Sequence, residues 1–332
     1  MIITRAPLRL SLFGGGSDYP EFFDRDRGAV LSTAIDRHCF VTANAFPSHL
    51  FDYSIRLSYR EVELVRRRDE IRHRVFKSCL ETCGIEADVE LHTMADLPAF
   101  TGLGSSSSFT VALLHALRAY QGRYLSPMEL AYEAIRVERG LLGDTVGCQD
   151  QVLAAVGGLR RVELRRVDDI FAENLCVSPQ RKLELQSHLV MVYTALQRPA
   201  SPLERSKLDR VEANRAALRR MVAMVDEAAD LLLGTAPIEG LGEMLDESWR
   251  LKRGLAAGVS NDAMDAMYRR GRDAGALGGK ILGAGGGGFL LFFVPPERQE
   301  QLIAAFPDHE ILHPRIDRPG SEVLFASADP ER

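Results

Sequence analysis

The sequence contains no apolar run that approaches the ~20 residues of a membrane span, and it lacks the basic-then-apolar start of a secretory signal. It also has no excess of positive charge, because 41 Lys+Arg against 46 Asp+Glu give a formal net charge of −5. This balance argues against a nucleic acid or an anionic membrane as the main partner. We therefore expect a cytoplasmic protein that binds neither.

Cysteine is sparse, with five residues scattered along the chain, which fits a reducing compartment. Cys79 and Cys83 would share one face of a helix, but no second Cys/His pair is spaced for zinc. Buried apolar thiols are the better interpretation of this pair. We expect no metal site built on histidine or cysteine.

The chain also shows no internal repeat, low-complexity linker or disordered tail. With 332 residues, of which 46% are hydrophobic, it is long enough for about two domains with proper cores. The polar stretch near residues 165–181 is the candidate boundary. The sequence thus predicts an N-terminal domain over residues 1–175 and a C-terminal domain over residues 176–332.

Residues 98–110 hold a glycine pair, four consecutive serines and the start of an apolar run that predicts a helix. The serines can cap this helix, whose first turn presents unpaired N–H groups to an anion. Gly102 and Gly104 let a ligand approach the backbone closely. The pattern indicates a phosphate site, although no Gly-Lys-Ser/Thr follows the glycines, as a Walker A loop requires. The alternative is a serine loop that merely caps the helix.

Two further segments are rich in glycine. Residues 14–16 follow an alternating strand and precede Ser17 and Asp18, and seven glycines from residue 278 to residue 288 precede an apolar strand. Both indicate close approach of a ligand to the backbone. A glycine-rich hairpin with a capping Asp18 is the alternative for the first.

Local patterns also predict helices. Apolar spacing predicts an amphipathic helix over residues 66–83. A capping box at Ser126 predicts another helix from Pro127 to about Leu142.

Phosphoryl transfer needs an anion site, oxygen ligands for Mg²⁺ and a group that orients the acceptor hydroxyl. Ser105 or Ser106 could place a hydroxyl on Mg²⁺, and Glu138 could supply a carboxylate. Asp150 could accept the acceptor proton, and Arg9 could neutralise charge on the transferred group. Each also has a simpler role, as a solvated helix residue, a loop cap or a surface strand charge.

Together these segments resemble the GHMP kinases. Pro98-x3-Gly-Leu-Gly-Ser-Ser-Ser is similar to their ATP-binding motif, and residues 280–288 (Lys-Ile-Leu-Gly-Ala-Gly-Gly-Gly-Gly) to their C-terminal glycine motif. Residues 6–19 are similar to the N-terminal motif that carries substrate contacts. Within the family, Gly-Gly-Gly-Ser-Asp-Tyr-Pro at residues 14–20 and Val-Gly-Cys-Gln-Asp-Gln at residues 146–151 most resemble the D-glycero-D-manno-heptose 7-phosphate kinases.

The resemblance implies an α+β fold with an N-terminal domain like ribosomal protein S5 domain 2, a ferredoxin-like C-terminal domain and a site between them. It implies ATP and Mg²⁺ as cofactors and a sugar phosphate as the small-molecule partner. Oligomeric state stays open between monomer and homodimer. Asp150 becomes the base, Arg9 the transition-state cation, Ser106 and Glu138 the Mg²⁺ ligands and Asp18 a sugar-hydroxyl contact.

The remaining expected contacts fall into two groups. Nucleotide contacts are expected from Gly102, Leu103, Gly104, Ser105, Ser106 and Ser107. Substrate contacts are expected from Gly15, Gly16, Ser17, Asp18, Thr194, Arg198, Gly285 and Gly286, with Arg198 as the candidate for binding a phosphate on the acceptor.

The leading hypothesis is an ATP-dependent kinase that phosphorylates heptose 7-phosphate at the anomeric hydroxyl, for synthesis of nucleotide-activated heptose. Two alternatives stay open. One is a kinase for another sugar, such as fucose, arabinose or a free heptose. The other is a non-catalytic relative that binds sugar and nucleotide.

Overall fold

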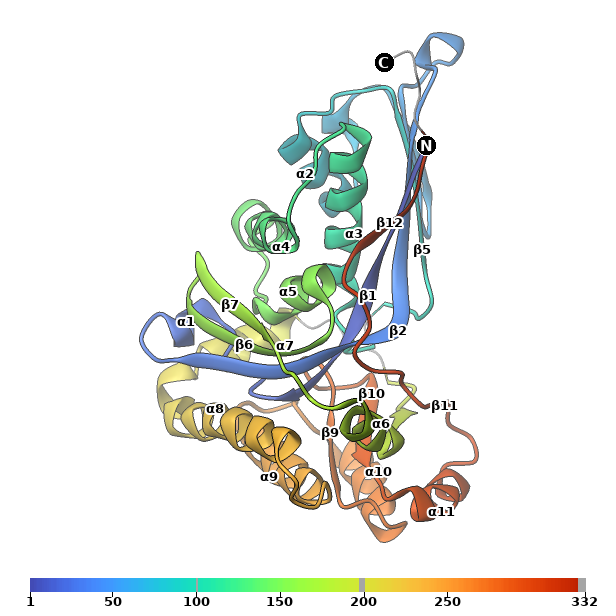
Figure 1. The fold of residues 1–332 in the computed structure, drawn as a ribbon. Coiled ribbons are helices and arrows are strands. Elements are labelled where there is room, and N and C mark those ends of the chain that lie inside the picture. Colours follow the sequence, from blue (N-terminus) through green and yellow to red (C-terminus); the bar gives the residue numbers. More distant parts are fainter. Residues whose placement is uncertain (100, 197–200, 328–332) are drawn as a thin grey trace.

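A computed structural model describes residues 1–99, 101–196 and 201–327 (Figure 1). Within these residues the strands form two sheets. The first sheet contains β1 (Ile2–Phe13), β2 (Gly28–Ala45), β3 (Ile55–Ser58), β4 (Val62–Val65), β5 (Val89–Ala95), β6 (Leu159–Arg166), β7 (Asp169–Asn174) and β12 (Glu322–Ala326). The second contains β8 (Leu189–Tyr193), β9 (Gly278–Ile281), β10 (Phe289–Phe293) and β11 (Ile311–Leu312).

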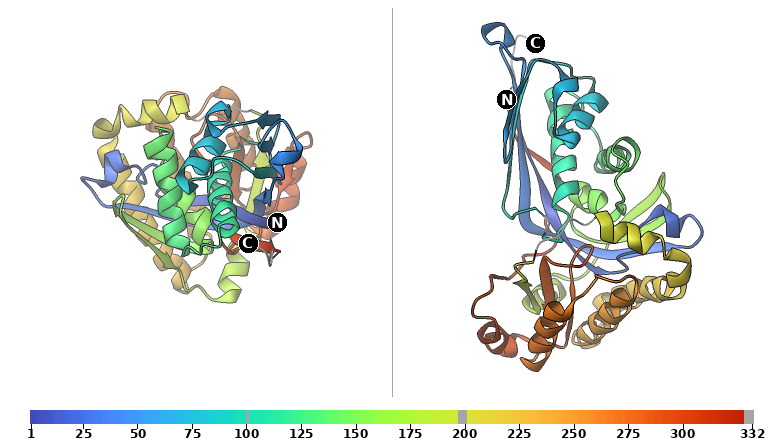
Figure 2. Two further views of the ribbon diagram at one scale, coloured as in Figure 1. Left: turned by 90° about the horizontal axis from the view of Figure 1, so that it is seen from above. Right: turned by 180° about the vertical axis from the view of Figure 1, so that it is seen from behind.

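The first sheet runs in the order β12-β1-β2-β5-β3-β4, and the long strand β2 bends so that its first half pairs with β6. The β3–β5 pair is parallel, and the other pairs in this sheet are antiparallel. Helices α2 to α5 lie on one side of this sheet (Figure 2). They are α2 (Arg74–Cys83), α3 (Ser105–Tyr120), α4 (Pro127–Ile135) and α5 (Gln149–Val156).

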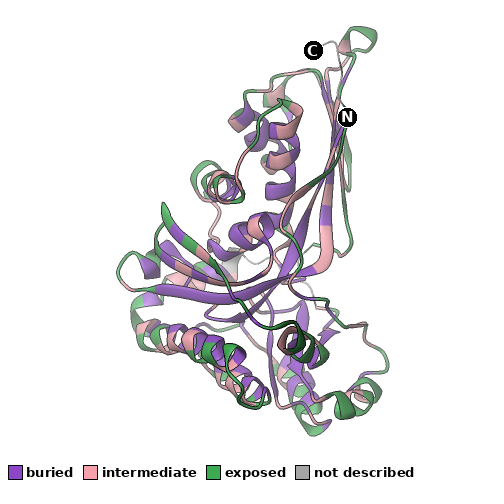
Figure 3. Cartoon of the chain, viewed as in Figure 1, coloured by how far each residue is buried: buried purple, intermediate pink, exposed green. Residues whose placement is uncertain are grey.

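The second sheet, in the order β11-β8-β10-β9, alternates its side chains between two cores. Val190 and Val192 join Trp249 and Phe292 in one core, whereas Leu189 and Met191 join the larger core of the molecule. Strands β8, β9 and β10 are therefore buried on both faces, as the purple segments of Figure 3 show.

The remaining helices lie mostly in the second half of the chain. They are α1 (Pro20–Phe23), α6 (Pro179–Ser187), α7 (Ser201–Leu208), α8 (Val211–Leu233), α9 (Gly240–Gly254), α10 (Asp262–Asp273) and α11 (Gln299–Ala305). Short 3₁₀ turns occur at η1 (Ser48–Leu50), η2 (Arg68–Glu70) and η4 (Pro296–Arg298). Helix α8 contacts β1 and β2 as well as α9, so it joins the two parts of the molecule.

Two expected helices differ in extent. The helix expected over residues 66–83 begins only at Arg74, and the earlier residues contain the short 3₁₀ turn η2 instead. The helix that starts at Pro127 becomes a π-helix, η3 (Arg136–Leu141), after Ile135. The capping box at Ser126 is present, with both of its hydrogen bonds.

The structure is α+β with two sheets, as expected. Sheet membership changes between β7 and β8, near the expected boundary at residue 175. However, β12 pairs with β1, so the end of the expected C-terminal domain belongs to the first sheet. Within the described residues, no helix has the length and apolar character needed to cross a bilayer.

Candidate active site

A cavity lies where the serine loop, the first glycine loop and the second sheet meet. Its wall takes residues from β1, the loop after β1, the start of α3, the start of α5, α7, α9 and β9. The lining residues that carry the argument below are Arg9, Ser11, Gly15, Gly16, Asp18, Tyr19, Gly102, Gly104, Ser105, Ser106, Ser107, Gly147, Gln149, Asp150, Glu204, Lys207, Lys252, Lys280 and Gly283.

Helix α3 points its N-terminus at this cavity. Its N-cap is Gly104, at φ +75°, and no side chain makes the cap hydrogen bond. The expectation that a serine caps this helix is therefore wrong: Ser105, Ser106 and Ser107 form the first turn itself. Because the described side chains leave this helix end uncapped, its N–H groups are available to an anion.

Arg9 and Asp150 form a two-pronged ion pair in the cavity. Nε and Nη2 of Arg9 donate to Oδ1 and Oδ2 of Asp150 at 2.6 and 2.8 Å, and Nη1 donates to the Gly102 carbonyl at 2.7 Å. The Arg9 side chain is 4% exposed and that of Asp150 is 24% exposed. Arg9 is thus fixed in place, while the carboxylate of Asp150 remains open to a ligand.

The register of β1 against β2 shifts between Pro7 and Arg9, and the Arg9 amide instead donates to the Leu103 carbonyl at 3.1 Å. This irregularity ties β1 to the serine loop. Leu103 itself is fully buried and does not line the cavity. It therefore supports the loop rather than making the expected contact with the nucleotide.

Asp18 is buried, and its Oδ1 accepts a hydrogen bond from the Gly16 amide at 2.9 Å. Burial raises the pKa of this carboxyl. A Cβ on Gly147 would lie 1.9 Å from Asp18 Oδ2, which explains the need for glycine there. The two glycine-containing loops therefore meet at Asp18.

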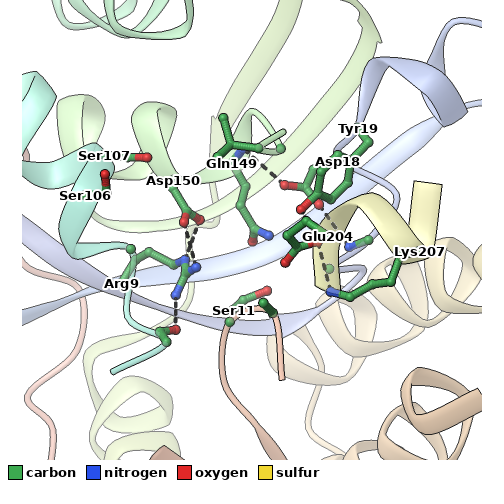
Figure 4. A pocket seen from close by; sticks show the side chains of 18 of the residues that line it. Arg9, Ser11, Asp18, Tyr19, Ser106, Ser107, Gln149, Asp150, Glu204 and Lys207 are labelled. Atoms are coloured by element: carbon green, nitrogen blue, oxygen red, sulfur yellow. Dashed lines mark hydrogen bonds and ion pairs between the residues drawn. The ribbon is translucent and has the colours of Figure 1, made fainter. Parts of the chain in front are cut away.

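Figure 4 places these groups along the cavity. Ser106 and Ser107 lie on one side of Asp150, and Asp18, Glu204 and Lys207 lie on the other. Gln149 is between the two carboxylates Asp150 and Asp18 in this view. We call the first side the serine end and the second the Asp18 end.

Glu138 is buried behind the serine end and does not line the cavity. Its Oε2 accepts from Ser107 Oγ at 2.8 Å and from Gln151 Nε2. The hydroxyl that pairs with Glu138 is therefore that of Ser107 rather than that of the expected Ser106, which is exposed. Burial raises the pKa of Glu138 to about 7.

Several expected substrate contacts do not line the cavity. Ser17 is buried, and its hydroxyl donates to the Gly14 and Ala29 carbonyls. The Thr194 hydroxyl likewise donates to the Gly288 carbonyl at 2.8 Å. Arg198 lies outside the described residues.

Gly285 and Gly286 support the loop instead of a ligand. A Cβ on Gly285 would lie 2.7 Å from the Val259 carbonyl, and the Gly286 amide donates to that same carbonyl. From this motif Gly283 and Ala284 reach the cavity. A Cβ on Gly102 would lie 2.5 Å from the Leu282 carbonyl, so the glycines allow the serine loop and this loop to touch.

Sequence reasoning missed five charged residues in the cavity, of which one is Asp144 in the loop before α5. Glu204 accepts hydrogen bonds from Tyr19 and Lys207, which ties α7 to the first glycine loop. Lys252 and Lys280 are buried, with 6% and 1% exposed. The position of Lys280 in the third glycine motif could have marked it as a cavity residue. In the sequence, Lys252 and the α7 residues Glu204 and Lys207 look like ordinary charges on helices.

Comparison with known proteins gives a consistent result. Residues 70–158 match the family description "GHMP kinases N terminal domain", and residues 232–311 match "GHMP kinases C terminal". The D-glycero-alpha-D-manno-heptose 7-phosphate kinase of Campylobacter jejuni is 32% identical over 314 residues, which cover 92% of each chain. A mevalonate kinase of Methanothermobacter thermautotrophicus is 30% identical over 214 residues, 62% of this chain and 65% of the relative.

A solved D-glycero-D-manno-heptose 1-phosphate kinase from Bacteroides thetaiotaomicron superposes with a TM-score of 0.81. The match covers 99% of this chain and 100% of the solved chain at 23% identity. At that identity the likeness concerns the fold alone.

Proposed function

The chain belongs to the GHMP kinase family of ATP-dependent phosphotransferases, and from this premise we propose that it phosphorylates D-glycero-D-manno-heptose 7-phosphate. The acceptor is the anomeric C1 hydroxyl, and the product is the 1,7-bisphosphate, which supplies nucleotide-activated heptose synthesis. The observation that carries the proposal is one cavity that joins an uncapped helix N-terminus, the Arg9–Asp150 pair and the buried Asp18. The 92% coverage shared with the Campylobacter jejuni heptose 7-phosphate kinase supports this choice of acceptor.

ATP places its phosphates at the serine end. The first turn of α3 offers backbone N–H groups and the positive end of the helix dipole, which together favour a polyanion. The hydroxyls of Ser105 and Ser106 and the Arg9 guanidinium add donors on the cavity side.

The residues at the serine end fit a Mg²⁺ ion. Glu138 Oε1 and Gln151 Oε1 are buried without a hydrogen-bond partner among the described residues, and Mg²⁺ takes hard oxygen ligands. A serine hydroxyl at the cavity wall, that of Ser107 or of Ser106, would hold the ion. Glu138, which lies behind the wall and accepts a hydrogen bond from Ser107, would supply the carboxylate beside it. Bound there, Mg²⁺ neutralises charge on the phosphates of ATP.

The protein groups around the acceptor act on its hydroxyl. Asp18 accepts a hydrogen bond from a sugar hydroxyl and fixes the ring. The C1 oxygen attacks the γ-phosphorus, its proton passes to Asp150, and the bond from the γ-phosphorus to the bridging oxygen of ADP breaks. Arg9, held by Asp150 and the Gly102 carbonyl, stabilises the charge on the phosphoryl group in flight.

Product analysis tests the proposal. Wild-type protein is incubated with ATP, Mg²⁺ and separate acceptors: heptose 7-phosphate, free heptose, fucose, arabinose and mevalonate. ³¹P and ¹³C NMR identify the product and the carbon that carries the new phosphate. We expect the highest kcat/KM with heptose 7-phosphate and a new phosphate on C1. Preference for another acceptor, or a new phosphate elsewhere, would overturn the assignment, and no turnover with any acceptor would point to a binding protein.

A further inference from the structure

Two buried lysines line the same cavity and have no role in the transfer described above. Lys252 comes from α9 and Lys280 from β9, so both belong to the second half of the chain. Lys252 Nζ donates to the carbonyls of Ile281 and Gly283 at 2.8 and 2.5 Å. Lys280 Nζ donates to the Leu12 carbonyl at 3.0 Å. An ammonium has three donors, so each lysine keeps at least one for a ligand.

These lysines differ from the other cations of the cavity. Arg9 is paired with Asp150, and Lys207 is paired with Glu204 at 2.9 Å. Across the described part of the chain, the hydrogen bonds of Lys252 and Lys280 go to neutral carbonyls, and neither forms an ion pair. A buried cation without an anionic partner is costly, and an anionic ligand removes that cost.

Lys280 lies near the glycine loop that leads to Asp18, because the Leu12 carbonyl that it binds is two residues before Gly14. The charged groups that act on Lys280 are Arg9 and Asp18, and those that act on Lys252 are Lys280, Lys207, Glu204 and Arg9.

The cavity also contains a buried hydroxyl group without a hydrogen-bond partner among the described residues, that of Ser11. Ser11 precedes Leu12, whose carbonyl binds Lys280, and it also lines the cavity. Its hydroxyl is buried and has no partner among the described residues. A polar ligand that reaches Lys280 thus also finds an unused hydroxyl on β1.

We infer that Lys252 and Lys280 form a second anion subsite in the cavity, which takes the phosphate group already carried by the acceptor. The inference rests on the proposed function for the identity of that acceptor. The expected contact from Arg198, which lies outside the described residues, stays a prediction beside it. The serine end then serves the phosphates of ATP, and the lysine pair distinguishes a sugar phosphate from a free sugar.

The burial of Lys252 and Lys280 also affects the protonation of their amines. Burial, with a smaller contribution from Arg9, lowers the pKa of Lys280 to about 7, and burial lowers the pKa of Lys252 well below its ordinary value. At pH 8 the Lys280 amine is therefore largely neutral in the free protein. A phosphate dianion at the subsite raises both pKa values, so its binding takes up protons from the buffer.

Calorimetry with two acceptors tests the subsite. Wild-type protein, Lys280→Gln and Lys252→Gln are titrated with heptose 7-phosphate and with the same heptose lacking its phosphate. Glutamine keeps an N–H donor for the backbone carbonyls but carries no charge. We expect Kd for the phosphorylated sugar to rise about 10- to 100-fold in each variant. Kd for the free heptose and for ADP should change less than about threefold, and thermal melting checks that each variant is folded.

Lys77→Met is the matched control, because Lys77 lies on α2 and its Nζ binds the Asp69 carbonyl at 2.7 Å, outside the cavity. It should leave all three affinities unchanged. Titrations at pH 8 in two buffers of different ionisation enthalpy should show proton uptake with wild-type protein and its reduction in both glutamine variants.

Three results would overturn the inference: equal losses for both sugars, a loss confined to ADP, or no proton uptake by the wild type. Inorganic phosphate, as a third probe, separates the inference from the proposed function. If wild-type protein rejects heptose 7-phosphate but binds phosphate through these lysines, the acceptor is wrong and the subsite stands. If the glutamine variants bind phosphate as the wild type does, the subsite is wrong.

Discussion

At the scale of single residues, Asp150 has two roles that one substitution can separate. It holds Arg9 through both carboxylate oxygens, and it lines the cavity in which we propose that the acceptor binds. Asp150→Asn keeps one acceptor for Arg9 but cannot take a proton. We expect kcat to fall about 10²–10⁴-fold, the usual range for a general base, with Kd for ATP nearly unchanged.

Steady-state kinetics and nucleotide titration of the folded variant check this prediction. A kcat within a few-fold of wild type would remove Asp150 as the proton acceptor and leave it as the residue that positions Arg9. Asp144→Asn is a useful control, because Asp144 also lines the cavity but its carboxylate pairs with Arg74 on α2. It should reduce kcat far less.

Glu138 predicts a pH dependence of stability. The pKa of its buried carboxyl is about 7, against an ordinary value of 4.5, so between these values the folded protein binds more protons than the unfolded chain. The contribution of Glu138 to the free energy of unfolding therefore falls as pH rises from about 4.5 to about 7. The 2.5-unit difference corresponds to a ceiling of about 3 kcal/mol.

Glu138→Gln should remove this decrease. Without metal or nucleotide, we expect the variant to gain stability relative to wild type between pH 5 and pH 8, by urea unfolding. Its stabilisation by Mg²⁺ and ATP should also be weaker than that of the wild type. Parallel pH curves for the two proteins would show that Glu138 is ionised in the folded state.

At the scale of elements, the two glycines that flank α3 allow a matched comparison of alanine substitutions. Gly104 has φ +75°, and a Cβ there would lie 3.1 Å from Asp150 Oδ2. Gly122, just after the same helix, has φ +68° and nothing within 4 Å of an added Cβ. Alanine at either position incurs a similar backbone strain of about 1–2 kcal/mol.

Gly104→Ala should therefore lose activity as well as stability, whereas Gly122→Ala should lose stability with kcat/KM nearly unchanged. Gly104→Val, with a larger side chain at the helix N-terminus, should abolish nucleotide binding. Thermal melting, kinetics and ADP titration of the three variants measure both effects. Unchanged ADP affinity in Gly104→Val would mean that the phosphates bind elsewhere.

The loop before α5 holds Asp18 through Gly147. Because a Cβ at Gly147 would lie 1.9 Å from Asp18 Oδ2, Gly147→Ala must displace that carboxylate. We expect KM for the acceptor to rise about tenfold or more, with KM for ATP unchanged. Gly140→Ala is the control nearby, since its Cβ would lie 3.8 Å from Arg136 Cγ. Equal acceptor KM values in the two variants would exclude Asp18 from acceptor binding.

At the scale of the whole molecule, β12 covers the edge of β1 with little apolar burial. Val323, Leu324 and Phe325 are all exposed, and Arg5 pairs with Glu322 at the surface at 2.7 Å. Deletion of residues 321–332 should lower the melting temperature by several degrees and promote aggregation, because it exposes the edge of β1. Glu322→Ala should cost less than about 1 kcal/mol. Light scattering and thermal melting compare the two, and a soluble deletion variant of unchanged stability would contradict the prediction.

Sequence reasoning found the parts of the site that carry a motif. The glycine loop with Asp18, the serine loop, Arg9 and Asp150 do converge on one cavity, and the family is confirmed. It chose Ser106 over Ser107, since the side of the helix that faces Glu138 depends on where the helix begins. It also assigned Thr194, Gly285 and Gly286 to the substrate. In the structure the Thr194 hydroxyl and the Gly286 amide donate to backbone carbonyls, and Gly285 packs against the backbone of Val259.

The residues that sequence reasoning missed come from the tertiary packing. Lys252 and Glu204 lie on helices whose exposed faces are rich in charge, and no local spacing marks them as buried. Only the packing of α7 and α9 against the loops after β1 and β9 turns them into cavity residues. Likewise, no pattern near residues 322–326 predicts pairing with β1, which lies about 320 residues earlier.

The return of β12 to β1 has a consequence for how the protein is made. During synthesis β1 emerges first, and its outer neighbour is translated only after all three glycine-rich segments and the whole second sheet. At roughly 5–20 residues per second, the edge of β1 stays open for some tens of seconds on the ribosome. The first sheet is therefore the last to be completed. A nascent chain arrested before residue 322 would expose the unpaired edge of β1 to chaperones or to other chains.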